Sequence, residues 1–429
     1  MLTWSSLSTT EQQSALARPA IADSSSLTDA VETIIEKVAK HGDKALFDLT
    51  QKFDKVELTS LLITDKAVVS ATNRLSDKRK LAIQTAYKQI ERFHQAQIPK
   101  DVVVETMPGV VCSLKTEAIE SVGLYIPAGT APLPSTVLML GVPAKIAGVE
   151  RVVLVCPPNK TGHIADEIIY AAKLCQISEI YTIGGAQAVA ALALGTETIK
   201  AVNKVFGPGN RFVTEAKKQL SQQVPGFAID MPAGPSELLV IADKSANPAF
   251  VASDLLSQAE HGSDSQVILL TDSVDMAKQV KAELDTQVEL LSRKDIAKLA
   301  LKESRLIVCD DLSQAVQVSN IYGPEHLSVQ TQDPQKLLPT LRNAGSIFVG
   351  NYSPDSAGDY ASGTNHVLPT YGYSKVISSL SLADFFRRYT VQELTKSGLQ
   401  SLAETIIELT DAEGLDAHQR AVTIRLEDS

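Results

Sequence analysis

The chain has 429 residues, of which 44% are hydrophobic and 21% charged, and its formal net charge is −10. This length exceeds that of most single compact cores, so two or more domains are expected. The negative charge and the lack of a long basic run argue against a nucleic-acid partner. Neither a secretory signal nor an apolar run of about 18 residues is found, so no membrane association is predicted and the expected location is the cytoplasm.

The cysteines give no indication of redox or metal chemistry. Cys112, Cys156, Cys175 and Cys309 all lie in apolar strand-like or helical runs, and none forms a Cys-x-x-Cys pair. A metal ligand or a thiolate nucleophile is the alternative for each. We interpret them as small buried hydrophobic residues in a reducing compartment.

The N-terminal third of the chain is predicted to be mostly helical. Apolar spacing and N-cap candidates predict helices over about 24–41 and 77–97. Two short β-rich runs, 102–104 and 110–114, flank a Pro-Gly pair and predict a hairpin.

From residue 122 onward, apolar strands alternate with amphipathic helices. The first series has strands over 123–126, 152–156, 180–183, 204–206 and 238–242, and helices over about 135–147, 163–175, 186–194 and 211–222. The second has strands over 267–271, 305–309, 327–331 and 346–350, and helices over about 247–261, 275–292, 312–321 and 334–343. Such a pattern indicates parallel sheets covered on both faces. The predicted fold class is α/β, with two doubly wound, Rossmann-like units and small helical segments at both ends.

The domain boundaries follow from these changes of pattern. The predicted parts are an N-terminal arm (1–20), a first α/β domain (21–124 and 238–380), a second α/β domain (125–237) and a C-terminal tail (381–429) that is helical from about 382 to 413. The tail is too small to bury a large core, so it is expected to dock on another surface, such as a second subunit.

Gln258 and His261 lie in the last turn of a predicted helix that ends at Gly262. Positions three residues apart project on the same side of a helix, so an amide oxygen and an imidazole nitrogen point together. Such a pair can bind a divalent metal if further ligands come from elsewhere. A solvated helix face is the alternative.

Two glycine turns follow predicted strands and open helices. They are Gly184-Gly185-Ala186-Gln187 and Gly207-Pro208-Gly209-Asn210. Turns of this kind can bring backbone N–H groups to a phosphate or a dinucleotide. Neither has the Gly-x-Gly-x-x-Gly pattern, so ordinary strand–helix turns are an equal alternative.

Several further side chains are candidates for chemistry. Glu325 and His326 are adjacent and could move protons near neutral pH, unless they belong to a surface loop. In a polar segment after residue 352, Asp359 could be a metal ligand or an Asx-turn residue, and His366 a ligand or a packing residue. His418, on the tail, is by itself typical of a surface residue.

Four motifs, at residues 230–237, 257–262, 323–326 and 356–366, resemble those of the histidinol dehydrogenase family in the same order. The resemblance extends over nearly the whole chain. It implies a zinc enzyme that oxidises L-histidinol to L-histidine through L-histidinaldehyde with two NAD⁺, the last step of histidine biosynthesis. It also implies a homodimer with shared active sites, in which the tail of one subunit completes the site of the other.

The resemblance also implies the roles of individual residues. The zinc ligands would be Gln258, His261, Asp359 and the tail residue His418, and the catalytic pair Glu325 and His326. Substrate contacts would come from Ser236, Gln258, His261, His326, Asp359, Glu413 and His418, and cofactor contacts from Tyr125, Gln187 and Asn210. The first α/β domain would then carry the metal and acid–base residues, and the second would bind NAD. One departure is Ala128, where the family pattern more often has glycine close to the cofactor.

A mechanism follows from these residue types. His326, with an ordinary pKa of ~6.5, is the candidate base for the alcohol proton. No cysteine lies in a suitable polar loop, so the aldehyde step is expected to use a hydrate whose water is activated by Glu325. Two other classes remain open, a non-catalytic nucleotide-binding α/β protein and a zinc hydrolase. The glycine turns and the full-length resemblance favour the dehydrogenase.

Overall fold

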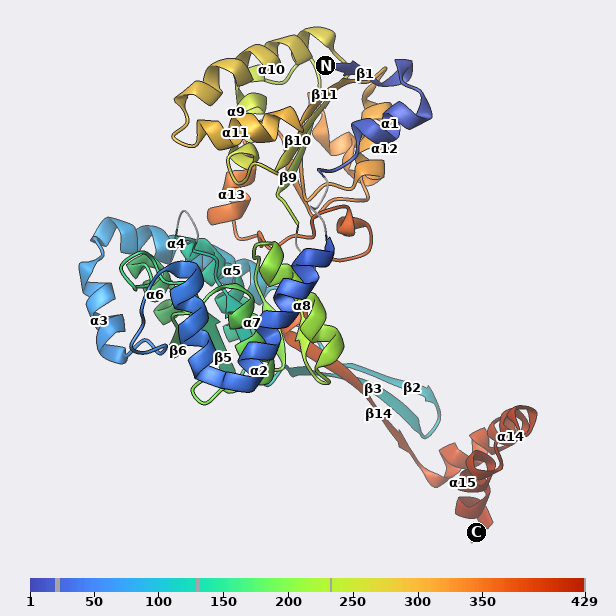
Figure 1. The fold of residues 1–429 in the computed structure, drawn as a ribbon. Coiled ribbons are helices and arrows are strands. Elements are labelled where there is room, and N and C mark those ends of the chain that lie inside the picture. Colours follow the sequence, from blue (N-terminus) through green and yellow to red (C-terminus); the bar gives the residue numbers. More distant parts are fainter. Residues whose placement is uncertain (20–23, 129–131, 232–233, 428–429) are drawn as a thin grey trace.

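The chain forms two α/β units and an arm that projects from them (Figure 1). The computed structural model describes residues 1–19, 24–128, 132–231 and 234–427. One unit contains a six-stranded sheet, the other a five-stranded sheet, and the arm contains a three-stranded ribbon that leads to two helices. Within those residues, no helix is both long and apolar enough to cross a membrane.

The six-stranded sheet is parallel throughout, in the order β1-β11-β10-β9-β12-β13. Its strands are β1 (Leu2–Thr3), β9 (Glu237–Ala242), β10 (Gln266–Thr271), β11 (Arg305–Val308), β12 (His326–Gln330) and β13 (Ser346–Val349). Its helices are α1 (Thr9–Ala15), α9 (Pro248–Ala259), α10 (Val274–Gln287), α11 (Lys294–Lys302), α12 (Leu312–Tyr322) and α13 (Asp355–Tyr360). Leu238 and Val240 enter one core and Leu239 and Ile241 another. Both faces are therefore covered, which explains the continuous apolar runs.

The five-stranded sheet is also parallel, in the order β6-β5-β4-β7-β8. Its strands are β4 (Ser121–Tyr125), β5 (Arg151–Val155), β6 (Glu179–Tyr181), β7 (Lys204–Phe206) and β8 (Ala228–Ile229). Its helices are α2 (Ser24–Asp54), α3 (Asp65–Arg74), α4 (Asp77–Gln95), α5 (Pro134–Ala147), α6 (Asp166–Leu174), α7 (Gly185–Leu194) and α8 (Arg211–Gln223). In both sheets the first strand of the series lies in the middle, which is the order of doubly wound folds. The α/β prediction with two parallel sheets is confirmed.

The N-terminal helices pack differently from the prediction that groups residues 21–124 with 238–380. Helix α2 contacts α7 and α8, α3 contacts α6, and α4 contacts α5. Residues 24–95 therefore cover the five-stranded sheet. Their apolar stripes gave no information about which sheet they would cover.

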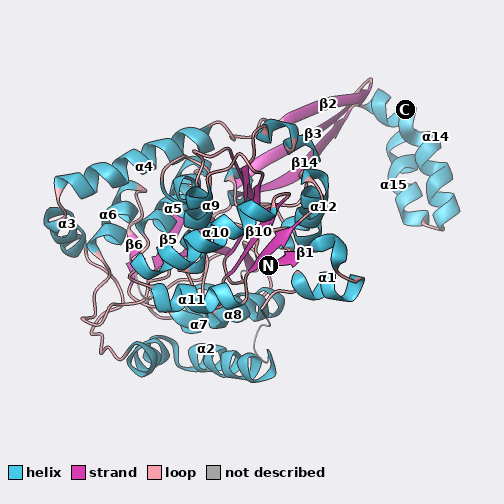
Figure 2. Cartoon of the chain, turned by 90° about the horizontal axis from the view of Figure 1, so that it is seen from above, coloured by secondary structure: helices cyan, strands magenta, loops and turns pink. Residues whose placement is uncertain are grey.

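The arm consists of β2 (Val102–Met107), β3 (Val110–Ala118) and β14 (Phe386–Leu394), followed by α14 (Lys396–Glu413) and α15 (Asp416–Glu427). The hairpin prediction is confirmed, with β2 antiparallel to β3. The helix predicted from about 382 to 413 is present only from Lys396 to Glu413, as α14, because residues 386–394 pair antiparallel with β3 along their whole length. Seen from above, the ribbon carries α14 and α15 away from both units (Figure 2).

Two shorter predictions also differ from the structure. The helix expected over 334–343 is two 3₁₀ turns, η3 (Pro334–Lys336) and η4 (Leu338–Thr340), because Pro339, in the interior of this range, cannot donate the hydrogen bond that an α-helix requires there. The polar segment after residue 352, whose Gly/Ser-rich composition predicts a loop, contains the short helix α13. The remaining 3₁₀ turns are η1 (Trp4–Ser6), η2 (Val288–Leu290), η5 (Tyr373–Lys375) and η6 (Leu382–Phe385).

Candidate active site

A small cavity of about 80 Å³ lies where the two units meet. It is lined by Gly207, Pro208, Lys217, Asp230, Met231, Gly234, Ser236, Glu325, His366, Val367, Leu368 and Thr370. Gly207 follows β7, so the five-stranded sheet contributes its carboxyl edge. Ser236 and Glu325 immediately precede β9 and β12, so the six-stranded sheet contributes its amino edge. Ligands of open α/β sheets usually bind beyond the carboxyl ends of the strands, and the cavity has this position for only one of the two sheets.

The acid–base candidates Glu325 and His326 are held by the backbone of Glu237. The N–H of Glu237 donates to Oε2 of Glu325 (2.9 Å), and the carbonyl of Glu237 lies 2.9 Å from Nδ1 of His326. A carbonyl can only accept, so Nδ1 carries a proton and the lone pair of the neutral ring is on Nε2. Both side chains are buried. His326 is thus held in the tautomer that a base acting through Nε2 requires.

Nε2 of His326 is buried and has no hydrogen-bond partner among the described residues. It lies 3.6 Å from Oδ1 of Asp359. Burial lowers the pKa of His326, but the carboxylates of Glu325 and Asp359 outweigh it and hold that pKa well above its usual range. Burial conversely raises the pKa of Asp359, but His326 outweighs it and the net pKa is lowered. A cation bound beside Asp359 would oppose protonation of His326.

Gln258, in the last turn of α9, has its amide oriented by a buried carboxylate. Its Nε2 donates to Oδ2 of Asp355 (2.8 Å), which also accepts from Oγ of Ser257 (2.7 Å). Oε1 of Gln258 is therefore the atom left over, and it is buried with no hydrogen-bond partner in the described part of the chain. An unpaired buried carbonyl is costly, so this oxygen fits a ligand such as a metal ion. Asp355 was not anticipated, and its only signal was its place four residues before Asp359.

The predicted metal ligands come together only in part within one chain. Asp359 lies on the same short helix, α13, as Asp355, and His261 lies near enough to help lower the pKa of Asp359. His418 is exposed on the tail, as is the predicted substrate contact Glu413, and the arm carries both away from this point (Figure 1). No group of three or more His, Cys, Asp or Glu side chains is placed to hold a metal within the residues described. Gln258, His261 and Asp359 offer an amide oxygen, an imidazole and a carboxylate, which are donor types that zinc can bind.

The predicted cofactor residues lie at the carboxyl edge of the five-stranded sheet. The Tyr125 hydroxyl accepts from the N–H of Gly185 (3.0 Å), and Gln187 is buried in the first turn of α7. Asn210 caps α8 by accepting from the N–H groups of Phe212 and Val213. These side chains shape the two glycine turns. Ala128, which follows Tyr125 closely in the sequence, is partly buried. Residues 129–131 lie outside the part of the chain that the structure describes.

The glycine turn after β7 requires glycine and is secured by a buried ion pair. Gly207 has φ +120°, and a Cβ there would lie 2.1 Å from the carbonyl oxygen of Tyr125. Its N–H donates to Asp230 (2.7 Å) and its carbonyl accepts from Nζ of Lys217 (3.0 Å), while Lys217 and Asp230 are themselves paired. Asp230 stood within a recognised motif, but nothing in the sequence indicated Lys217 as its partner.

His366 joins the two units and is not placed as a metal ligand. Its Nδ1 lies 2.9 Å from the carbonyl oxygen of Asp359, and its Nε2 lies 3.2 Å from Oγ1 of Thr136 on α5. Both ring nitrogens are therefore engaged, and burial lowers its pKa, which favours the neutral ring. Of the two roles left open for this residue, packing is the one seen.

A buried Glu–His pair beside a cavity between two α/β units with parallel sheets is an arrangement that can transfer protons, as in the active site of an enzyme. The family model described as histidinol dehydrogenase matches residues 17–426. Histidinol dehydrogenase of Colwellia psychrerythraea is 70% identical over 428 residues, covering 100% of this chain and 99% of that protein. That of Aliivibrio fischeri is 59% identical over 99% of this chain and 96% of its own length.

A solved structure agrees with these relatives. The crystal structure of histidinol dehydrogenase from Elizabethkingia anophelis has a TM-score of 0.95 and 45% identity, covering 98% of this chain and 97% of that one. The chain therefore belongs to the histidinol dehydrogenase family, which is a family of oxidoreductases.

Proposed function

We propose that the chain oxidises L-histidinol to L-histidine through L-histidinaldehyde, with two NAD⁺ and one zinc ion per site, as the last step of histidine biosynthesis. The observation that carries the proposal is two buried atoms with no hydrogen-bond partner among the described residues: Nε2 of His326, which lies 3.6 Å from the carboxylate of Asp359, and Oε1 of Gln258. The first suits a base and the second a metal ligand. Family membership supports the substrate.

Zinc would be held by Gln258, His261 and Asp359 of one subunit and by His418 from the tail of another. When bound, it would act as a Lewis acid toward an amino alcohol and help to orient it. The residues of this chain would orient the metal-binding atoms, and Asp355 orients the amide of Gln258 by accepting a 2.8 Å hydrogen bond from its nitrogen. Ser236, in the wall of the cavity, and Glu413 of the tail are the remaining proposed substrate contacts.

His326 is the proposed base for the alcohol step. Its Nε2 would accept the hydroxyl proton while Nδ1–H stays bonded to the carbonyl of Glu237, which stabilises the charged ring. When bound near the glycine turns, at Tyr125, Gln187 and Asn210, NAD⁺ would accept the hydride. The cavity wall is shared by a glycine turn and Glu325, which supports the proximity that this requires.

Glu325 is proposed to activate water in the aldehyde step, with His326 removing the next proton. A covalent thioester is disfavoured, because burial raises the pKa of Cys156, Cys175 and Cys309 to about 12. Cys112 lies on β3, in the arm. All four cysteines are free, which also supports the proposed cytoplasmic location.

We propose a homodimer in which each arm completes the partner's site. The arm exposes apolar side chains such as Val103 (61% exposed) on β2 and Leu409 (59%) on α14, and a second subunit would cover such surfaces. The missing zinc ligand and the distant position of His418 support the same arrangement.

The test is an assay of NADH formation on adding L-histidinol, with L-histidine measured as product. Two NADH per L-histidinol are expected, and the activity should fall on zinc chelation and return when zinc is added. No NADH with a folded, zinc-loaded protein would reject the proposal. Hydrolysis of an amide or ester without NADH formation would favour the zinc hydrolase. Binding of NAD without turnover would favour the non-catalytic nucleotide-binding protein.

A further inference from the structure

We propose that the buried ion pair between Arg18 and Glu237 positions Glu325 and His326, and that Arg18 and Tyr371 are positioning residues for the acid–base pair. The inference rests on the proposed function and goes beyond it. It assigns a catalytic purpose to the segment that includes residues 17–19, which contacts neither the proposed metal ligands nor the glycine turns among the contacts described.

The backbone of Glu237 hydrogen-bonds to both proposed catalytic side chains, which also contact each other (Nδ1 of His326 lies 3.5 Å from Oε2 of Glu325). Its N–H donates to Glu325 and its carbonyl accepts from His326, each at 2.9 Å. A rotation of this one residue would therefore misplace Oε2 of Glu325 and release Nδ1 of His326 together. Because Glu237 is the first residue of β9, it has strand pairing on one side only.

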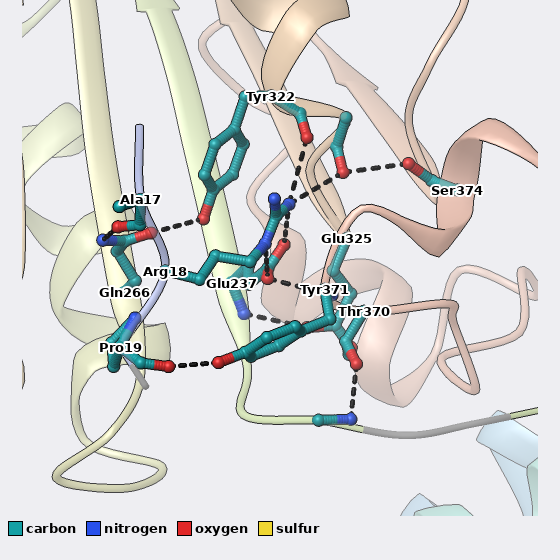
Figure 3. Close-up of polar contacts among 12 residues, drawn as sticks. Ala17, Arg18, Pro19, Glu237, Gln266, Tyr322, Glu325, Thr370, Tyr371 and Ser374 are labelled. Atoms are coloured by element: carbon teal, nitrogen blue, oxygen red, sulfur yellow. Dashed lines mark hydrogen bonds and ion pairs between the residues drawn. The ribbon is translucent and has the colours of Figure 1, made fainter. Parts of the chain in front are cut away.

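The side chain of Glu237 is held by charge and by a backbone donor (Figure 3). Arg18 binds it in a bidentate manner, with Nε 2.5 Å from Oε1 and Nη2 3.0 Å from Oε2. The N–H of Tyr371 donates to the same Oε1 (2.9 Å). Both carboxylate oxygens thus have fixed partners, and a bidentate guanidinium sets the plane of the carboxylate as well as its position.

Arg18 is itself fixed by the segment that leads to the catalytic pair. Its Nη2 donates to the carbonyls of Tyr322 (3.1 Å) and Gly323 (3.2 Å), and its guanidinium lies 4.0 Å from the centre of the Tyr322 ring. Gly323 is only two residues before Glu325. One guanidinium therefore connects the start of β9 to the start of β12, the two strands that carry the pair.

Tyr371 adds a second connection, at a conformational cost. Its φ is +59°, which is unfavourable for a bulky residue and needs support from its surroundings. Its hydroxyl donates to the carbonyl of Pro19, and its N–H to Glu237. The strained residue is thus tied both to the N-terminal segment and to the carboxylate.

Removal of Arg18 would leave the carboxylate of Glu237 buried without a counter-charge, which is unfavourable. The Glu237 side chain is 2% exposed, and burial raises its pKa despite the opposing effect of Arg18. Without its partner the carboxylate would take up a proton or turn toward water. Either change would disturb the first residue of β9.

The test compares Arg18→Met with wild type in the holoenzyme, using L-histidinol and NAD⁺ at saturation. We expect kcat to fall by about 10- to 100-fold, because a small misplacement of reacting groups has effects of this size. KM for NAD⁺ and the zinc content should stay within about twofold, since neither the proposed NAD⁺ contacts nor the proposed zinc ligands include Arg18 or Glu237. Arg18→Lys, which keeps the charge but not the bidentate geometry, should recover only part of kcat.

A double variant separates positioning from folding. Arg18→Met with Glu237→Met removes both buried charges, and such replacements commonly preserve stability. We expect this variant to be folded but still low in kcat; full recovery of kcat would show that Arg18 only neutralises a buried charge and would overturn the proposal. The matched control is Arg74→Met, which breaks a bidentate pair with Asp166 on the surface and should leave kcat unchanged.

The outcomes distinguish this proposal from the proposed function. Wild type that forms no NADH rejects the function itself. Active wild type with an equally active, folded Arg18→Met rejects only the positioning role.

Discussion

Asp355 accepts a 2.8 Å hydrogen bond from the amide nitrogen of Gln258, and this contact decides which amide atom is left for a metal. An amide that is free to rotate could present its NH₂ group, which cannot bind a cation. We therefore expect Asp355→Ala to weaken zinc binding by about tenfold or more, as loss of ligand-orienting contacts commonly does. Competition with a chromophoric chelator measures it directly.

Ser257→Ala provides the matched control for that variant. It removes the other donor to the same oxygen of Asp355 but keeps the bond to Gln258. Its zinc affinity should remain close to that of wild type. Equal affinities of Asp355→Ala and wild type would contradict the orienting role.

His418 tests whether the tail acts on a second subunit. His418→Asn should lower zinc content, and His326→Asn should abolish activity without the same loss of zinc. When the two inactive variants are mixed and reassembled, a mixed dimer has one intact site if His418 acts in the partner. Random pairing should then restore about one quarter of wild-type activity, because half the dimers are mixed and half of their sites are intact.

The same experiment has a clear contrary result. If His418 served its own chain, every site in the mixture would lack one residue and no activity would return. Each variant reassembled alone is the control for incomplete inactivation.

Glu325→Gln should separate the two oxidation steps. The amide keeps the acceptor for the N–H of Glu237 but cannot take a proton from water. We expect the oxidation of L-histidinaldehyde to slow by about 100-fold or more, and the alcohol step by much less. Single-turnover measurements with each substrate give the two rates, and His326→Asn should slow both. Equal losses in Glu325→Gln would contradict the proposed division of roles.

Lys217 is expected to matter for both stability and cofactor binding. Its side chain is 3% exposed and that of Asp230 is 1% exposed, so Lys217→Met leaves a buried, unpaired carboxylate. The free energy of unfolding should fall by about 3–5 kcal/mol. KM for NAD⁺ should rise, because the turn at Gly207 loses one of its two anchors.

Lys218→Met is the neighbouring control, since its ion pair with Glu215 is largely exposed on the lysine side. It should change the unfolding free energy little. Denaturant unfolding and NAD⁺ titration check both variants. An unchanged KM for NAD⁺ in a folded Lys217→Met variant would show that this ion pair does not contribute to NAD⁺ binding.

The sequence indicates the residues that we propose to perform chemistry, but not those that hold them in place. Gln258, Asp359, Glu325 and His326 stand in local motifs whose residue types indicate their roles. Arg18 cannot be recognised in this way, because its partner is 219 residues away and an arginine before a proline has many other uses.

The same reason explains the errors in the fold. Strand β14 lies more than 260 residues after its partner β3, and a mostly exposed strand has little intrinsic signal without its neighbour. The helices over about 24–41 and 77–97 were predicted from their own periodicity, which cannot specify the sheet they cover. Local patterns thus determine elements, and long-range contacts determine their partners.

Asp254 is expected to make the stability of the fold depend on pH, independently of the proposed catalytic reaction. Burial, together with the nearby charge of Asp355, raises its pKa to about 7, although a 2.7 Å bond from Gln330 opposes the shift. An unfolded Asp has a pKa near ~3.9, so between about pH 4 and 7 the folded state binds more protons than the unfolded state. Stability should therefore fall as pH rises through this window. Asp254→Asn, which resembles the protonated form, should lose this slope and be more stable than wild type at pH 8. Denaturant unfolding at several pH values measures both, and an identical slope in the variant would assign the effect to another group.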